Sequence, residues 1–347
     1  ISCISANQVL HALDSEKYEV IPVYISRENE FFIGDELFDL ANYSAFLKDP
    51  SSALKKVSLY KDGNRVFLKQ IDGLFRKPQP INVAFPVVHG TNVEDGTLAG
   101  YLQMLDIPFT SCDVLGGSLG QDKAVMKDVF KSEGIPMAKP ANLGSSIGIE
   151  VIRSQKEFRE KVEECLKYDF KVVVEHMIED LKEVNVSVIG TDSEARCSAI
   201  EEVTNGFLDY DKKYNPNGSK GSKKLPAKVS GSKTASKGMA STVRKVPAEL
   251  TKAQQKTIEE TALKAFRVLH SYGCVRIDFM IDKADGTVYC NEINTIPGSL
   301  AFYLWKENGI SFTQECDELI ENALKRYARR SSKTYSFATT ILDNYRK

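Results

Sequence analysis

The sequence predicts an α/β protein, α+β in parts, with two or three domains. Its 347 residues are enough to bury a large core and to divide into domains. Residues 1–112 alternate helical and strand-like patterns, which is typical of an α/β domain with a largely parallel sheet. Towards the other end, two runs rich in β-branched and aromatic residues flank the pair Asp285-Gly286, which predicts a β-hairpin.

The composition narrows the class of protein. A formal net charge of −1 and an apolar content of 42% are those of an ordinary globular chain, not of a disordered or nucleic-acid-coating one. No apolar run approaches membrane-spanning length and no basic segment precedes an apolar signal core, so we expect no membrane contact. The seven cysteines lack CxxC spacing and the four histidines are scattered, which predicts reduced cytoplasmic thiols and no zinc site.

The first 112 residues are predicted to contain a helix, two buried strands and a polar loop. Residues 6–13 are expected to be helical, and residues 18–25 and 82–88 are expected to be buried strands. The polar, Gly-bounded loop 89–97 would then follow the carboxyl end of a parallel strand, where α/β folds bind ligands. His89 in this loop is therefore a candidate binding residue, with a structural role as the equal alternative.

Residues 118–132 show helical spacing, with Lys123 on the first turns. The Gly/Ser segment 139–149 follows, and such a loop can aim backbone N–H groups at phosphates. It lacks the GxxxxGK[ST] pattern of a P-loop, so a plain hairpin turn is the alternative until partners such as Lys139 are considered.

Two further strands are predicted at 171–178 and from residue 183 to 188, and they carry Glu175 and Glu183. Both glutamates could equally be surface charges. Residues 209–245 are rich in Gly, Ser and Lys and too polar to pack, which indicates a mobile loop and, in a compact domain, an active-site lid. Because no aromatic residues interleave its lysines, a solvated loop is favoured over a polyanion site. Helices are expected over 247–272 and 314–329.

The hairpin gathers polar residues on one face. Alternation places Val275, Ile277, Phe279 and Ile281 on one side of the first strand, so Arg276 and Asp278 share the other, and Glu292 and Asn294 share a face of the second strand. With an odd number of loop residues, Arg276 would lie opposite Glu292. Carboxylate and amide oxygens gathered in this way suit Mg²⁺, and an ordinary ion pair on a half-exposed hairpin is the alternative.

These segments together resemble the D-alanine–D-alanine ligases of the ATP-grasp superfamily. The resemblance covers almost the whole chain, in the order His89-Gly90 with Glu94-Asp95-Gly96-Thr97, Asp122-Lys123, 139–146, Asp209-Tyr210 with Lys213-Tyr214, Arg276-Ile277-Asp278, and 291–295 with Pro297-Gly298. It implies a three-domain ATP-grasp fold with an N-terminal parallel-sheet α/β substrate domain (1–112), a central lid domain (113–200) and a C-terminal catalytic domain (201–347).

The resemblance also implies the roles of individual residues. The metal ligands would be Asp278, Glu292 and Asn294, holding two Mg²⁺ ions or Mn²⁺ in their place. The substrate and catalytic residues would be His89, Ser145, Lys213, Tyr214, Arg276 and Gly298. The ATP-binding residues would be Lys123, Lys139, Gly144, Ser146, Glu175, Met177, Ile178, Glu183, Phe207, Lys213 and Asn291.

The implied activity is the ATP-dependent joining of two D-alanines through an acyl phosphate, for peptidoglycan precursors. Alternatives are a ligase whose second substrate is D-serine or D-lactate, and a nucleotide-binding module without turnover. Tyr214 argues for an amine as the second substrate, because the family's D-lactate ligases lack this tyrosine. The expected partners are ATP and D-alanine, with no nucleic acid and no membrane, in a cytoplasmic homodimer.

Three departures from the family pattern stand out. The family's glycine-rich first strand, with its acidic substrate contact, would precede Ile1, and further strand and linker would lie between Met137 and Lys139. The segment Ser299–Trp305 replaces a Thr- and Ser-containing stretch that grips the second substrate in the family, which leaves the choice of second substrate open.

Overall fold

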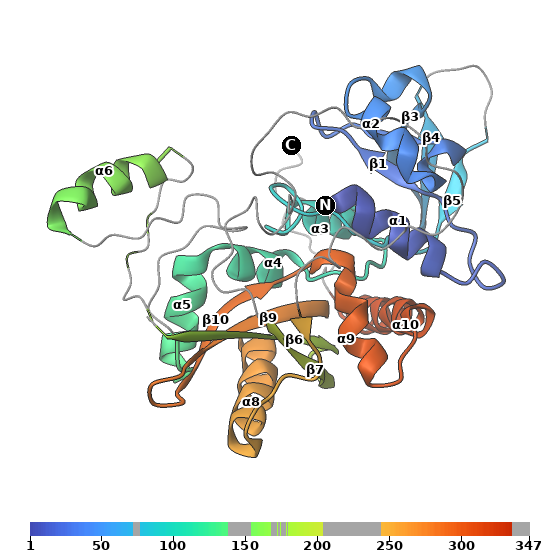
Figure 1. Ribbon diagram of the computed structural model, residues 1–347. Coiled ribbons are helices and arrows are strands. Elements are labelled where there is room, and N and C mark those ends of the chain that lie inside the picture. The colour runs from blue at the N-terminus through green and yellow to red at the C-terminus, as the bar shows by residue number, and fades with distance from the viewer. Residues whose placement is uncertain are drawn as a thin grey trace, which may run out of the picture.

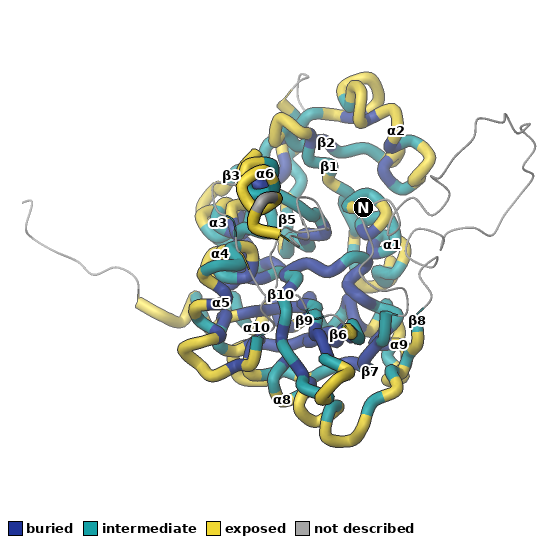
Figure 2. The backbone as a smooth tube through the Cα atoms, turned by 60° about the vertical axis from the view of Figure 1, so that its left-hand side comes forward, coloured by how far each residue is buried: buried dark blue, intermediate teal, exposed yellow. Residues whose placement is uncertain are grey.

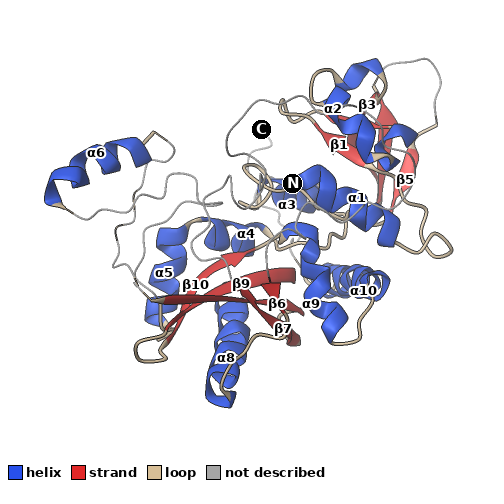
Figure 3. Ribbon diagram, viewed as in Figure 1, coloured by secondary structure: helices blue, strands red, loops and turns tan. Residues whose placement is uncertain are grey.

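The computed structural model in Figure 1 describes residues 1–71, 77–137, 154–167, 172, 174, 178, 180–203 and 244–334. Strands in these ranges form two five-stranded sheets, one with the order β1-β2-β3-β4-β5 and the other with the order β10-β9-β6-β7-β8. Figure 3 shows the first sheet among the N-terminal helices and the second sheet with helices on both sides. The α/β class predicted from the sequence is confirmed.

The N-terminal part contains short elements. Its strands are β1 (Val23–Ile25), β2 (Phe31–Ile33), β3 (Lys55–Asp62), β4 (Arg65–Gln70) and β5 (Gln79–Ile81). Its helices are α1 (Ser2–Ala12), α2 (Tyr43–Phe46) and α3 (Thr97–Met104), with 3-10 turns η1 (Asp35–Phe38), η2 (Leu40–Asn42) and η3 (Pro50–Ser52). The helix expected over 6–13 is therefore present and begins earlier.

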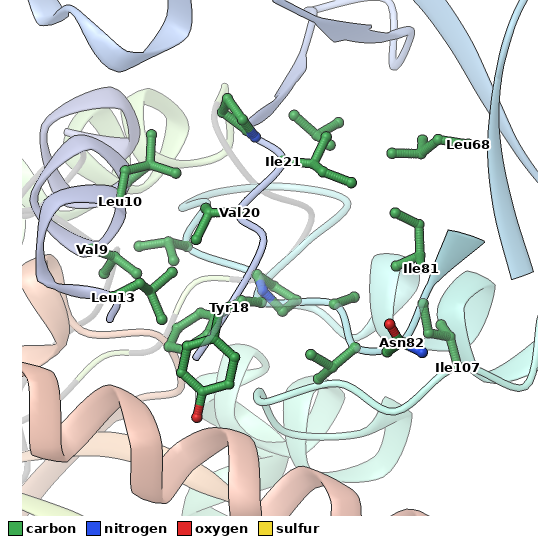
Figure 4. Close-up of a pocket in the computed structure, with 18 of the residues that line it drawn as sticks. Val9, Leu10, Leu13, Tyr18, Val20, Ile21, Leu68, Ile81, Asn82 and Ile107 are labelled. Atoms are coloured by element: carbon green, nitrogen blue, oxygen red, sulfur yellow. The ribbon is translucent and has the colours of Figure 1, made fainter. Parts of the chain in front are cut away.

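The expectation of a largely parallel N-terminal sheet is wrong for the described residues, since every pairing from β1 to β5 is antiparallel. Of the expected strand 18–25 only β1 forms, and 82–88 contributes a single parallel bridge from Ala84 to Phe109. Both segments instead line an apolar pocket of about 380 Å³ (Figure 4). A strand needs a partner for its backbone groups, and no described strand pairs with the rest of either segment.

The second sheet carries most of the core. Its strands are β6 (Leu181–Gly190), β7 (Ala195–Val203), β8 (Arg244–Lys245), β9 (Gly273–Asp282) and β10 (Val288–Asn294). All its pairings are antiparallel, and the predicted hairpin and the strand 183–188 are confirmed within β9, β10 and β6. The sheet joins residues from both sides of the domain boundary expected at residue 200.

One face of this sheet is covered by α8 (Lys252–Val268), as Figures 1 and 2 show. Val184, Val186, Val275 and Ile277 are buried there with the apolar side of α8. Since side chains alternate along a strand, the residues between them face the opposite side of the sheet. The alternation predicted for β9 is thereby confirmed, and Arg276 and Asp278 lie half-buried on the face opposite α8.

The helix expected over 247–272 is shorter at both ends. Thr251 forms a capping box with Gln254, accepting from its N–H at 3.2 Å and donating its own N–H to Gln254 Oε1 at 3.1 Å, so α8 begins after Thr251. At the other end Gly273 has a φ of +74°, and a side chain there would overlap the carbonyl oxygen of Thr110. The strand β9 begins at this glycine.

The single helix expected over 118–132 is two helices, α4 (Val114–Gln121) and α5 (Lys123–Ser132). Asp122 has extended backbone angles, and its Oδ1 accepts from the N–H groups of Ala124 and Val125, both at 3.1 Å. An aspartate cap begins a new helix. Lys123 consequently lies at the first position of α5.

The remaining helices are α6 (Gln155–Cys165), η5 (Gly298–Ala301), α9 (Phe302–Glu307) and α10 (Phe312–Ser331). The terminal helix expected over 314–329 is confirmed as part of α10. Among the helices that the structure describes, none has both the length and the apolar character needed to span a lipid bilayer.

Candidate active site

The β9–β10 hairpin brings the predicted metal ligands together. Glu292 lies opposite Asp278, and Asn294 lies opposite Arg276. The conditional expectation that Arg276 would face Glu292 is wrong. Ile281 pairs with Val288 at the turn, so a regular ladder would place Arg276 opposite Ile293, and the bulge between Cys290 and Glu292 shifts its partner to Asn294. The predicted grouping on one face nevertheless holds.

The bulge explains the burial pattern of β10. Cys290 and Ile293 are three residues apart, yet both pack in the core beneath the sheet. A regular strand would send them to opposite faces. The bulge takes up the extra residue, Asn291, so that Glu292 and Asn294 lie with Asp278 on the face opposite α8.

Arg276 and Asp278 form a two-pronged ion pair along β9. The Arg276 Nε and Nη2 atoms donate to the two oxygens of Asp278 at 2.7 and 2.8 Å, and Asn294 Nδ2 donates to Asp278 Oδ2 at 3.2 Å. Burial disfavours the guanidinium charge, but the adjacent carboxylate outweighs it and raises the pKa of Arg276 well above its usual value. Arg276 is therefore a fixed cation in a partly dry site.

Lys123 supplies a second cation to the same face. Its Nζ lies 3.2 Å from Glu292 Oε2 and donates to the carbonyl oxygens of Ile293 at 3.3 Å and Gly120 at 3.4 Å. A lysine at the first position of a helix adds to the positive end of the helix dipole. The arrangement favours an anion such as a phosphate above the start of α5.

The donor set fits a divalent metal ion. Asp278 and Glu292 provide carboxylates and Asn294 provides an amide oxygen, a combination that suits Mg²⁺ with further ligands from water or phosphate. In this arrangement Arg276 and Lys123 balance the two carboxylates. Within the ranges that the structure describes, no cluster of three or more His, Cys, Asp or Glu side chains offers a different metal site.

One site-face residue was not predicted. Glu201 on β7 is fully buried, and its carboxylate accepts from Asn185 Nδ2 at 3.1 Å, Tyr303 OH at 2.8 Å and Arg244 Nη1 at 3.1 Å. Burial first, and the Glu201 charge second, raise the pKa of Tyr303 above its usual range. Nothing in the sequence pairs Glu201 with Arg276; only the register of β7, β6 and β9 brings these residues close.

His89 does not follow a strand as expected, but its loop reaches the end of β10. His89 Nε2 lies 3.2 Å from Ser5 Oγ, and its Nδ1 lies 3.8 Å from Glu94 Oε1. Thr295, directly after β10, donates its hydroxyl to the carbonyl oxygen of Glu94 at 3.4 Å. The His89 loop and the segment that leads to Gly298 are thus in contact.

The other predicted residues are placed as follows. Glu183 lies on β6, between Met280 of β9 and Val203 of β7. Asn291 is the bulge residue, and its buried Oδ1 has no hydrogen-bond partner among the described residues. Ile178 is described but belongs to no strand. Outside the described residues lie Lys139, Gly144, Ser145, Ser146, Glu175, Met177, Phe207, Lys213 and Tyr214. Most of the loop expected over 209–245 lies outside them too, but its last two residues form β8 and pair with β7, so the expected loop is too long at this end.

Two family models match this chain in tandem. "D-ala D-ala ligase N-terminus" matches residues 1–112, and "D-ala D-ala ligase C-terminus" matches residues 102–243 and 231–321. The chain belongs to the D-alanine–D-alanine ligase family. Its members include the D-alanine–D-alanine ligase of Thermosipho melanesiensis, which is 36% identical over 371 aligned residues, covering 99% of this chain and 94% of the relative.

Solved structures of the D-alanine–D-alanine ligase family share the fold. The ligase from Coxiella burnetii superposes with a TM-score of 0.77 at 21% identity, covering 95% of this chain and 91% of the other. The ligase from Bacillus anthracis, in a crystal structure complexed with ATP, superposes with a TM-score of 0.63 at 21% identity, covering 95% and 94%. The ATP-grasp architecture expected from the sequence is thereby confirmed.

Proposed function

We propose that the protein is an ATP-dependent ligase that joins two D-alanines for peptidoglycan precursor synthesis. The observation that carries the proposal is the grouping of Lys123, Arg276, Asp278, Glu292 and Asn294 on one sheet face, in a chain 36% identical over nearly its full length to a D-alanine–D-alanine ligase. The paired cations and carboxylates argue against a nucleotide-binding module that has lost turnover.

The proposed reaction has two steps. A carboxylate oxygen of the first D-alanine attacks the γ-phosphorus of ATP, and the bond to ADP breaks to give D-alanyl phosphate. The amine of the second D-alanine, after losing a proton, then attacks the carbonyl carbon. The new C–N bond forms as the C–O bond to phosphate breaks, and inorganic phosphate leaves.

Phosphoryl transfer depends on charge neutralisation and in-line positioning. Lys123, at the first position of α5 after the Asp122 cap and beside Glu292, would contact phosphate oxygens. Asp278, Glu292 and Asn294 would hold Mg²⁺, two ions in our proposal. When bound, the metal neutralises charge on the transferred phosphoryl group.

The second step develops negative charge on the carbonyl oxygen. Arg276 remains protonated throughout, because a guanidinium keeps its charge near neutral pH and the Asp278 carboxylate raises its pKa further. Together with the backbone N–H of Gly298 it would stabilise this oxyanion. Water must be excluded from the acyl phosphate, and we assign that role to the segment carrying Lys213 and Tyr214, together with Ser145.

The proposed setting is the cytoplasm. All seven cysteines are free, a state that a reducing compartment maintains. The proposed assembly is a homodimer, for which light scattering of the purified protein provides the test.

The test of the main proposal is product analysis. The protein is incubated with ATP, Mg²⁺ and D-alanine, and ADP and dipeptide are measured; D-serine and D-lactate are then offered as second substrates. We expect ADP release with D-alanine and, with equal D-alanine and D-lactate near pH 7, mainly dipeptide. An absence of D-alanine-dependent ADP would refute the proposed function, and a depsipeptide majority would refute the assignment of the second substrate.

A further inference from the structure

Ser5 lies at the meeting point of two segments that are far apart in the sequence. Its Oγ accepts from the backbone N–H of Ser299 at 2.9 Å, and the same oxygen lies 3.2 Å from His89 Nε2. The Ser5 and Ser299 residues are only 1% and 4% exposed. Because the contact is buried, water cannot readily replace the hydroxyl if it is removed.

The segment that Ser5 holds has an unfavourable backbone. Ser299, Leu300 and Ala301 have φ values of 52°, 53° and 56°, a left-handed run without glycine. Non-glycine residues adopt this conformation singly and rarely in succession. Strained backbone of this kind persists only where surrounding contacts hold it.

The holding contacts come from two sides. From α1, Ser5 accepts from the Ser299 N–H, and Gln8 accepts from the Ser299 hydroxyl. From β9, the Cys274 thiol donates to the carbonyl oxygen of Leu300 at 3.1 Å. The Ser5 bond acts on the peptide unit that joins Gly298 to Ser299, so it limits the rotation of the Gly298 backbone.

We infer that Ser5 is a positioning residue for the second step of the reaction. It fixes the Gly298–Ser299 turn and His89 relative to each other. The backbone N–H of Gly298, the oxyanion donor, is then aligned with the acyl group. This inference rests on the proposed function, since the roles of Gly298 and His89 come from there. Without the Ser5 hydroxyl, the acyl phosphate would still form, but more of it would react with water to give D-alanine and phosphate.

The first measurement does not depend on activity. Hydrogen exchange is followed at the Ser299 amide in wild type, Ser5→Ala and Ser5→Cys. The cysteine variant is nearly isosteric with serine, so it keeps the side-chain volume if the alanine variant folds poorly. Losing a buried acceptor should speed exchange by about tenfold. Ser2→Ala is the matched control for the exchange measurement. Ser2 lies one turn earlier on α1, and its Oγ accepts from the backbone N–H of His89 at 3.0 Å rather than from Ser299.

The second measurement is the ratio of ADP released to dipeptide formed. Ser5→Ala and Ser5→Cys should raise this ratio above the wild-type value with the KM for ATP unchanged. A merely structural loss would lower activity at a constant ratio. Unchanged exchange or an unchanged ratio in both Ser5 variants would overturn the inference, whereas wild type without D-alanine-dependent ADP would overturn only the proposed function.

Discussion

Glu315, in the first turn of α10, gives the protein a pH-dependent stability that one substitution should remove. Its side chain is fully buried beside Cys274, and neither carboxyl oxygen has a hydrogen-bond partner among the described residues. Burial raises the pKa of Glu315 from 4.5 to about 9. The helix dipole favours the charged form here by only about 1 kcal/mol, so burial dominates.

The sign follows from proton linkage. Between pH 4.5 and about 9 the folded protein keeps a proton on Glu315 that the unfolded chain releases. The contribution of the protonated Glu315 to the free energy of unfolding is complete below pH 4.5. It is lost as the pH rises towards the folded-state pKa, by about 1.4 kcal/mol per pH unit. At pH 7 the loss amounts to roughly 3 kcal/mol, a large share of the stability of a typical domain.

The assay is urea unfolding at half-unit steps from pH 5 to pH 8. Glu315→Gln stays neutral, so its free energy of unfolding should vary less steeply with pH, and it should exceed that of wild type increasingly towards pH 8. Glu321→Gln is the control, because Glu321 is an exposed carboxylate of the same helix whose pair with Lys325 contributes at most about 1 kcal/mol. Parallel pH curves for wild type and Glu315→Gln would refute the reasoning.

Two further substitutions test the site and the fold. Glu292→Gln should lower Mg²⁺-dependent ADP formation by about 100-fold or more with the fold intact. The control is Glu202→Gln, which removes a similarly half-buried strand carboxylate paired with a lysine and should not lower ADP formation. Equal activity in the two variants would mean that Glu292 is not a metal ligand. Gly273→Ala should destabilise by about 2–4 kcal/mol, because φ is positive and the methyl group overlaps Thr110. Gly309 has a similar φ, but nothing lies within contact distance of an added methyl group, so Gly309→Ala should lower the free energy of unfolding by only about 1 kcal/mol in thermal unfolding. Equal losses in the two variants would mean that the overlap with Thr110 contributes nothing.

The sequence predicted those parts of the structure that depend on local periodicity. The faces of β9 follow from strict alternation, and α8 and α10 from helical spacing, so these were confirmed. The break at Asp122 is also local, because an aspartate can cap a new helix inside an apolar pattern. A capping signal of this kind, read more closely, would have separated α4 from α5.

What the sequence did not predict depends on partners distant in the chain. Segments 18–25 and 82–88 have strand-like composition, but composition does not say which strand pairs with them or in which direction. Glu201 is surrounded by residues of β6, β8 and α9, and Ser5 meets Ser299 across 294 positions. No local pattern carries such information.

The bulge in β10 has a consequence for Asn291. If this residue were deleted, Cys290 could still pair with Phe279, and the following glutamate could still pair with Asp278, in a regular ladder. The pairing of the hairpin therefore makes no demand on Asn291, which is an optional insertion as far as the fold is concerned. A substitution of Asn291 therefore leaves the strand register, and with it the positions of Glu292 and Asn294 opposite Asp278 and Arg276, unchanged.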